Sequence, residues 1–156
     1  MKGKIFFDMD GTIADLYNTK GWLDAFHKEE PIFDEIAPMV DMKELKTLCE
    51  ELQAKEIEIG IITWLPMDAR AKYEKRCEED KKIWIRKHMP YINEFHALKY
   101  GTPKTVVVER KEDEIVILID DNNEVIEEWN QHENHVGLKV ENGNTIKKIK
   151  EMLGIK

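Results

Sequence analysis

Residues 5–13 read Ile-Phe-Phe-Asp-Met-Asp-Gly-Thr-Ile, and this stretch decides the fold. Its first three residues are apolar on both alternating faces, as is typical of a strand covered by helices on both sides. Asp8 and Asp10 follow where this strand ends, and the crevice beyond the carboxyl ends of such strands is where ligands bind. The same letters describe a plain Asp-x-Asp-Gly turn. Two acids after a buried strand are costly, however, unless they are paired or hold a metal, which favours a functional site.

Strand and helix patterns alternate along the rest of the chain. Strands are expected at residues 5–7, 57–63, 95–98, 115–119 and 136–140; a turn with a short helix is expected over 14–28, and helices over about 42–55 and 66–88, with two more opened by Asn122 or Asn123 and by Thr145. This alternation predicts an α/β fold, with a parallel sheet of about five strands and helices on both faces. Two segments stay open: 29–39 is an irregular connection or a very small insertion, and 105–110 is a strand or a short helix.

Charge and composition narrow the class of protein. The 156 residues suit one domain, and 36% charged with 42% apolar residues is typical of a soluble globular chain. A net charge of −8 argues against broad nucleic-acid binding. No window is apolar enough for a membrane span and the N-terminus lacks a signal-peptide pattern, so a cytoplasmic protein without a membrane partner is expected. Cys49 and Cys77 have no nearby Cys or His partner and are expected to be core thiols.

The helix expected over 66–88 carries a dense charged run from Lys72 to Lys82. We expect this run to form a solvated face of the helix. The other face carries Tyr73, Cys77, Trp84 and His88. None of the five histidines has the spacing of a metal ligand, so we interpret them as structural or surface residues.

Polar groups of unlike kinds stand at the ends of several expected strands and turns. They are Asp8 and Asp10, Thr63, Lys104, and Asp120 with Asp121. If they share one rim of the sheet, their carboxylate oxygens suit Mg²⁺, which prefers oxygen ligands. The lysine and the hydroxyl then supply a cation and a donor for phosphate oxygens. Together these parts predict phosphoryl transfer.

In sequence order, these groups resemble the four motifs of the haloacid dehalogenase (HAD) superfamily. The resemblance is carried by Asp8-Met9-Asp10-Gly11-Thr12, the apolar strand ending at Thr63, Lys104, and the apolar strand ending at Asp120-Asp121. It covers nearly the whole chain and implies a Rossmann-like sheet with the strand order 5-4-1-2-3. It also implies a single domain over residues 1–156. The stretch between the first two motifs is short, so a cap is absent or is a very small insertion around residues 16–40, which leaves the site open or completed by a second subunit.

The resemblance also assigns roles to the acids. Asp8 is implied as the nucleophile that forms an aspartyl-phosphate, and Asp10 as the general acid and then the base. An Asp at this second position is what separates phosphatases from the dehalogenases that name the superfamily. Mg²⁺ is implied to bind Asp8, the backbone carbonyl of Asp10, and either Asp120 or Asp121; the sequence does not choose between the last two.

The remaining motif residues are implied to handle the phosphoryl group. Thr63 is expected to bond a phosphoryl oxygen and Lys104 to neutralise and orient the group. Lys99 is a rival for the lysine role because it flanks the same turn. Lys104 is favoured because residues 103–107, Pro-Lys-Thr-Val-Val, look like the lysine motif of the deoxyribonucleotidase-type members. Thr12 is expected to support the motif loop and is grouped with the substrate-binding candidates.

The expected function is therefore Mg²⁺-dependent hydrolysis of a small phosphomonoester, with a 5′-nucleotidase as the narrower form. Trp64, together with Tyr17 and Trp22, is placed to stack on a base, and packing alone explains the tryptophans equally well. A phosphotransferase would use the same residues with another acceptor in place of water. A non-catalytic or regulatory HAD-fold protein would be expected to lack one of the catalytic carboxylates, and all are present here.

Overall fold

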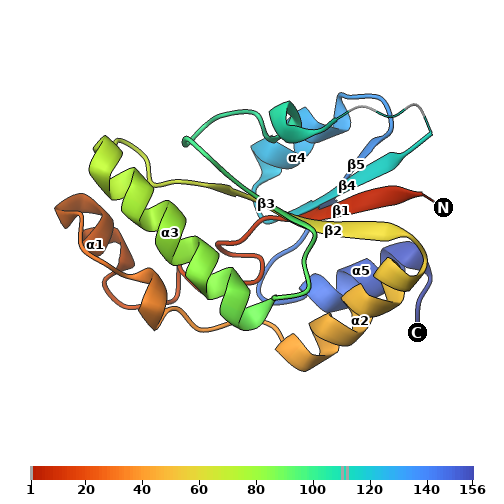
Figure 1. Ribbon diagram of the computed structural model, residues 1–156, viewed down its shortest axis with the longest axis horizontal. Helices are drawn as coiled ribbons and strands as arrows, with labels where there is room; N and C mark the ends of the chain where they lie inside the picture. Colours follow the sequence, from red (N-terminus) through yellow and green to blue (C-terminus); the bar gives the residue numbers. More distant parts are fainter. Residues whose placement is uncertain (1, 110, 112) are drawn as a thin grey trace.

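The computed structural model describes residues 2–109, 111 and 113–156. Within these residues, five parallel strands form one sheet in the order β3-β2-β1-β4-β5 (Figure 1). The strands are β1 Gly3–Phe7, β2 Ile57–Trp64, β3 Glu94–Leu98, β4 Ile115–Asp120 and β5 His135–Lys139. The predicted α/β class, the parallel sheet and its strand order are confirmed.

The register of the sheet brings three strand ends to one level. Phe7, the last residue of β1, pairs with Ile61 of β2 and with Ile119 of β4. The next backbone N–H, that of Asp8, continues the ladder by donating to the carbonyl of Ile119 over 2.8 Å. The residues that follow β1 and β4 therefore emerge side by side, with the end of β2 on the other side of β1.

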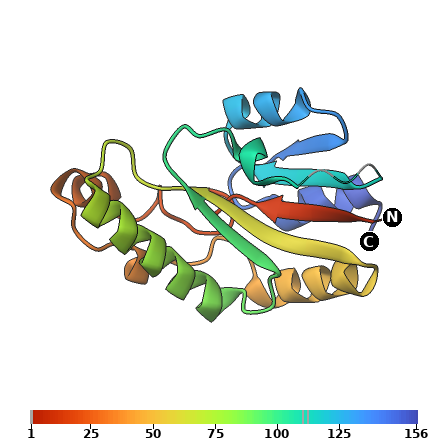
Figure 2. The same cartoon turned by 45° about the horizontal axis from the view of Figure 1, so that its top comes forward.

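Helices cover both faces of this sheet (Figures 1 and 2). They are α1 Trp22–Lys28, α2 Met42–Ala54, α3 Ala71–His88, α4 Asn123–Asn130 and α5 Thr145–Leu153, with 3₁₀ turns η1 Phe33–Glu35 and η2 Lys104–Val107. Alternate strand residues supply two cores, because successive side chains of a strand point to opposite faces. Ile5 and Ile59 pack on the side of α2, α3 and α5, and Phe6 and Leu118 pack on the side of α4 and η2.

Residues 15–38 form a small insertion after β1. Its neck is closed by two backbone hydrogen bonds, from Asp15 to Ala37 and from Met39 to Ile13, each 2.9 Å long. The insertion carries α1 and η1 and lies against α3, where the indole N–H of Trp84 donates to the carbonyl of Ile36 over 2.8 Å. Residues 29–39 are therefore a part of an anchored insertion rather than a free connection.

Two local expectations were wrong, and one segment that the sequence left open is now described in part. The third helix begins at Ala71 rather than at Pro66, because Asp68 has a left-handed backbone (φ 56°) and Arg70 is extended. Thr145 does not cap α5: it is the first helical residue, and its hydroxyl donates to the carbonyl of Thr12 over 2.8 Å. The open segment at 105–110 begins inside the 3₁₀ turn η2, and Arg110 lies outside the described residues.

Two further expectations concern composition. Cys49 and Cys77 are buried free thiols, as predicted. No helix among the described residues combines the length and the apolar character needed to cross a membrane.

Gly60 marks the tightest point of the core on the α4 side. A Cβ at this position would lie 2.7 Å from the ring of Phe6, which is fully buried against Trp129. We therefore expect Gly60→Ala to lower the free energy of unfolding by about 1–3 kcal/mol, although alanine is the better strand residue. Chemical denaturation measures the change, with Glu127→Ala, an exposed residue of α4, as the control. A variant as stable as the wild type would contradict this packing.

Candidate active site

Three carboxylates gather where β1 and β4 end. Asp8 follows β1, Asp120 is the last residue of β4, and Asp121 comes directly after it. Each offers an oxygen that lies within 4.8 Å of the oxygens offered by the other two. Asp8 and Asp120 are buried, at 7% and 1% exposure. The structure thus brings together the acids of the first and the last motif, as the sequence predicted.

One buried lysine holds two of these acids. Lys104 Nζ donates to Asp8 Oδ1 over 2.8 Å and to Asp120 Oδ2 over 2.7 Å. Burial alone would lower the pKa of Lys104, but the two carboxylates outweigh burial and raise it above its ordinary value. The rival, Lys99, has a side chain that is 81% exposed and pairs with Glu74 over 3.6 Å. The lysine among the acids is therefore Lys104.

The negative charge of the three carboxylates exceeds the positive charge of the lysine that pairs with them. Burial, followed by repulsion from Asp8, raises the pKa of Asp120 to about 6 and that of Asp121 to about 8. Asp120 has both oxygens engaged, Oδ2 by Lys104 and Oδ1 by the backbone N–H of Asn122 at 3.0 Å. Asp121 instead faces the two negative charges of Asp8 and Asp120. An all-oxygen donor set with excess negative charge fits a hard divalent cation such as Mg²⁺.

The loop after β1 is shaped to reach this cluster. Gly11 has φ +82°, and a Cβ there would collide with Asp121 Oδ2 and with the ring of Tyr17. Only glycine allows both the left-handed backbone and this approach. Thr12 is fully buried, and its hydroxyl donates to Asp8 Oδ2 over 3.2 Å. Thr12 therefore supports the loop and the acid, and its hydroxyl is not directed at a substrate.

A second lysine, which sequence reasoning missed, holds Asp10. Lys81 Nζ donates to Asp10 Oδ2 over 2.8 Å, to Thr63 Oγ1 over 2.7 Å and to the carbonyl of Trp64 over 2.7 Å. Its side chain is only 1% exposed. The prediction that the whole charged run of 72–82 is solvated was therefore wrong at this residue.

The signal for Lys81 was present in the helix period. Residues 73, 77, 81 and 84 follow one another at the spacing of a single helix face. Tyr73, Cys77 and Trp84 were expected on the buried side, and all three are buried, so a lysine between them had to be buried as well. Lys81 was missed because the charged run was interpreted as one solvated segment.

Asp10 is partly buried, with 13% of its side chain exposed, and among the residues that the structure describes only one of its oxygens has a hydrogen-bond partner. Burial raises its pKa above the ordinary value even though the adjacent Lys81 lowers it, and Asp8 raises it further. Within the described residues its second oxygen, Oδ1, is buried and has no hydrogen-bond partner. A carboxyl group with one anchored and one unpartnered oxygen is suited to give and take a proton.

Aromatic side chains lie near the acids and Lys104. Trp64 is partly buried, its indole N–H donates to the carbonyl of Thr102 over 2.8 Å, and Lys104 Nζ lies 5.6 Å from its ring centre. The exposed ring of Tyr100 packs against it at 4.9 Å. Tyr17, whose ring lies beside Gly11, is half exposed and meets Trp22 edge-on at 5.1 Å. The two tryptophans thus act as packing supports, while the two tyrosines present open surface.

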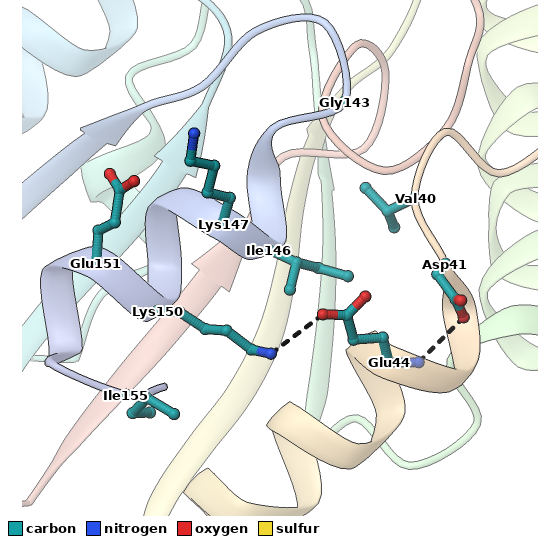
Figure 3. Close-up of a pocket in the computed structure, with 9 residues that line it drawn as sticks. All are labelled: Val40, Asp41, Glu44, Gly143, Ile146, Lys147, Lys150, Glu151 and Ile155. Carbon is teal, nitrogen blue, oxygen red and sulfur yellow. Dashed lines mark hydrogen bonds and ion pairs between the residues drawn. The ribbon is translucent and has the colours of Figure 1, made fainter.

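The hollow drawn in Figure 3 is a different place. It has a volume of about 480 Å³ and opens between α2 and α5. Its charges are mixed, and Lys150 is already paired with Glu44 over 3.1 Å. None of the acids of the site lines it. The carboxylate cluster at the strand ends is therefore separate from this hollow.

The cluster can hold a divalent cation and present one lysine, Lys104, and one hydroxyl, that of Thr63, to an anion. Among the described residues, the three acids after β1 and β4 are the one group of Asp, Glu, His and Cys side chains close enough to share a metal, which leaves the histidines outside it. No protein-family model and no curated protein matches the chain.

The raised pKa values make a prediction about stability without metal. Asp120 and Asp121 bind protons more tightly in the folded than in the unfolded chain, whose ordinary value is 3.8. With chelator present, the free energy of unfolding should therefore fall as pH rises from about 4 to 8. Added Mg²⁺ should restore more stability at about pH 8 than at about pH 5, because the deprotonated acids bind it.

Thermal melts of Asp121→Asn isolate this effect. In chelator, the variant should melt close to the wild type at about pH 5 and above it at about pH 8, where the wild type carries the uncompensated charge. A difference in melting temperature that does not change with pH would mean that Asp121 does not carry this charge.

Proposed function

We propose that this protein is a Mg²⁺-dependent phosphomonoester hydrolase of the HAD type that works through an aspartyl-phosphate on Asp8. The observation that carries the proposal is the pairing of Asp8 with Lys104 beside two further carboxylates, with the half-satisfied Asp10 two residues away. The confirmed strand order agrees with the one that the motifs implied. Membership of the superfamily is part of this proposal.

The first step forms a bond between a carboxylate oxygen of Asp8 and phosphorus and breaks the bond from phosphorus to the leaving oxygen. Asp10 gives its proton to that leaving oxygen. In the second step Asp10 takes a proton from water, whose oxygen attacks phosphorus, and the bond from phosphorus to Asp8 breaks. The raised pKa of Asp10 favours the protonated form that the first step needs.

Two groups face the phosphoryl oxygens in this scheme. Lys104 brings positive charge next to Asp8, and so neutralises the charge that gathers around phosphorus. The hydroxyl oxygen of Thr63 accepts a hydrogen bond from Lys81, so its own hydrogen is free to donate to a phosphoryl oxygen.

The residues proposed to hold Mg²⁺ are Asp8, Asp121 and the backbone carbonyl of Asp10. Asp121 is the better direct ligand of the final pair, since both oxygens of Asp120 are engaged by Lys104 and Asn122. When bound, the cation neutralises phosphate charge and helps to align the phosphoryl group with the attacking oxygen.

A nucleoside monophosphate is the narrower substrate that the motif around Lys104 favours. The exposed rings of Tyr17, beside Gly11, and Tyr100, beside Trp64, support a substrate with a nucleobase, because such rings stack on bases. The insertion at 15–38 is small, so a bulkier phosphoester is the alternative within the same reaction.

Phosphate release from a panel of phosphomonoesters tests the function. The panel holds 5′- and 3′-deoxynucleotides, sugar phosphates and phosphorylated oligonucleotide ends, each with Mg²⁺ and with chelator. We expect metal-dependent turnover that Asp8→Asn lowers by at least about a thousandfold, because the covalent route is lost. Asp24→Asn, an exposed acid of α1, is the control.

The other outcomes separate the alternatives. Transfer of phosphate to an added alcohol in place of water would identify a phosphotransferase. Folded protein that binds Mg²⁺ but turns over no member of the panel would sink the hydrolase and favour a regulatory binding protein.

The two candidate lysines differ enough to be tested directly. Lys104→Met should lower kcat/KM by about 10²- to 10³-fold, because it removes the buried cation beside the nucleophile. Lys99→Met should stay within about twofold of the wild type, since its exposed ammonium pairs with Glu74. Steady-state kinetics on the best substrate of the panel decides, and equal losses in the two variants would contradict the assignment.

A further inference from the structure

Lys81 is as deeply buried as Lys104, and its contact with Asp10 has no part in the reaction described so far. We infer that Lys81 is a positioning residue, which anchors Oδ2 of Asp10 and so leaves Oδ1 as the oxygen that carries the proton for the leaving group. The inference rests on the hydrolase function proposed above. It concerns the proton step, whereas that function rests on the nucleophile and the cation cluster.

The ammonium group of Lys81 has no capacity left for a substrate. A lysine offers three donors, and here all three have short contacts, to a carboxylate, a hydroxyl and a carbonyl, at 2.7–2.8 Å. The ring of Phe33 from η1 lies over the same nitrogen, 5.0 Å from ring centre to Nζ. Any effect of Lys81 on the reaction must therefore pass through the groups that it holds.

Its contact with Asp10 decides where the proton of that acid sits. An ammonium nitrogen donates hydrogen bonds but cannot accept one. A proton on Asp10 Oδ2 would point at a donor, so the proton belongs on Oδ1. Oδ1 is the buried oxygen without a hydrogen-bond partner among the described residues. Lys81 thereby aims the acid's one exchangeable proton away from itself.

The ammonium group of Lys81 also orients the hydroxyl group of Thr63. Because Lys81 donates to Thr63 Oγ1, the hydroxyl hydrogen of Thr63 must point elsewhere. Asp10 and Thr63 are thus oriented together by one side chain that comes from α3, while both acceptors come from the ends of central strands. Lys81 therefore holds the proton donor, Asp10, and the phosphate-binding hydroxyl of Thr63 in fixed positions relative to each other.

A comparison of two leaving groups tests the role. A nitrophenolate leaves without being protonated, whereas an alkoxide needs the proton of Asp10. We expect Lys81→Met to lower kcat/KM for an alkyl phosphate by about 10²-fold or more. The loss of kcat/KM for 4-nitrophenyl phosphate should be about ten times smaller. Asp10→Asn should show the same bias. Lys82→Met, whose side chain pairs with Glu78 on the outer side of α3, should show none.

The ratio of the two activities within one preparation does not depend on how much of the protein is folded. Loss of stability in Lys81→Met therefore cannot imitate the expected bias. Lys81→Arg keeps a cation that can donate to Asp10 and should recover part of the ratio.

An equal loss on both substrates, or none, would overturn the positioning role and leave the hydrolase standing. A wild-type protein without turnover on either substrate would remove the function and the inference together.

Discussion

The repulsion among three carboxylates at the ends of β1 and β4 is the constraint on which the site depends. Parallel pairing forces Asp8 and Asp120 side by side, because their strands are neighbours in register. Among the residues that the structure describes, Lys104 is the one cation that pairs with these two acids. The remaining imbalance appears as the raised pKa values of Asp120 and Asp121. A fold that carries such a cluster gains stability whenever a cation or a proton arrives.

Two buried lysines pair with different acids of the site. Lys104 pairs with Asp8 and Asp120, and Lys81 pairs with Asp10. Lys104 comes from η2 on the face of the sheet covered by α4, and Lys81 comes from α3 on the other face. Each cation is costly to bury, and each is compensated by short contacts to charged or polar oxygens. The proposed nucleophile and the proposed proton donor thus have separate hydrogen-bond partners, although Asp8 still raises the pKa of Asp10.

Sequence reasoning succeeded where the pattern is repeated and failed where one contact decides. The alternation of apolar strands and helices predicted the parallel sheet, the resemblance to the HAD superfamily implied its strand order, and the acids after 5–7 and 115–119 marked the candidate site. Lys81 was missed because a charged run was judged as a block rather than position by position. The cap expected at Thr145 was also wrong, because its hydroxyl makes a long-range hydrogen bond to the carbonyl of Thr12 instead. The choice between Lys99 and Lys104 needed the path of the turn in space.

The anchoring of the insertion limits how the site can be altered. Phe33 and Ile36 of the insertion contact α3 at Lys81 and Trp84, so the second half of the insertion supports the helix that holds Asp10. In α1, by contrast, Ala25 is the one buried residue, while Trp22 and Phe26 pack against the core in part. Substitutions on the outer side of α1 would therefore be tolerated more readily than substitutions in residues 33–36.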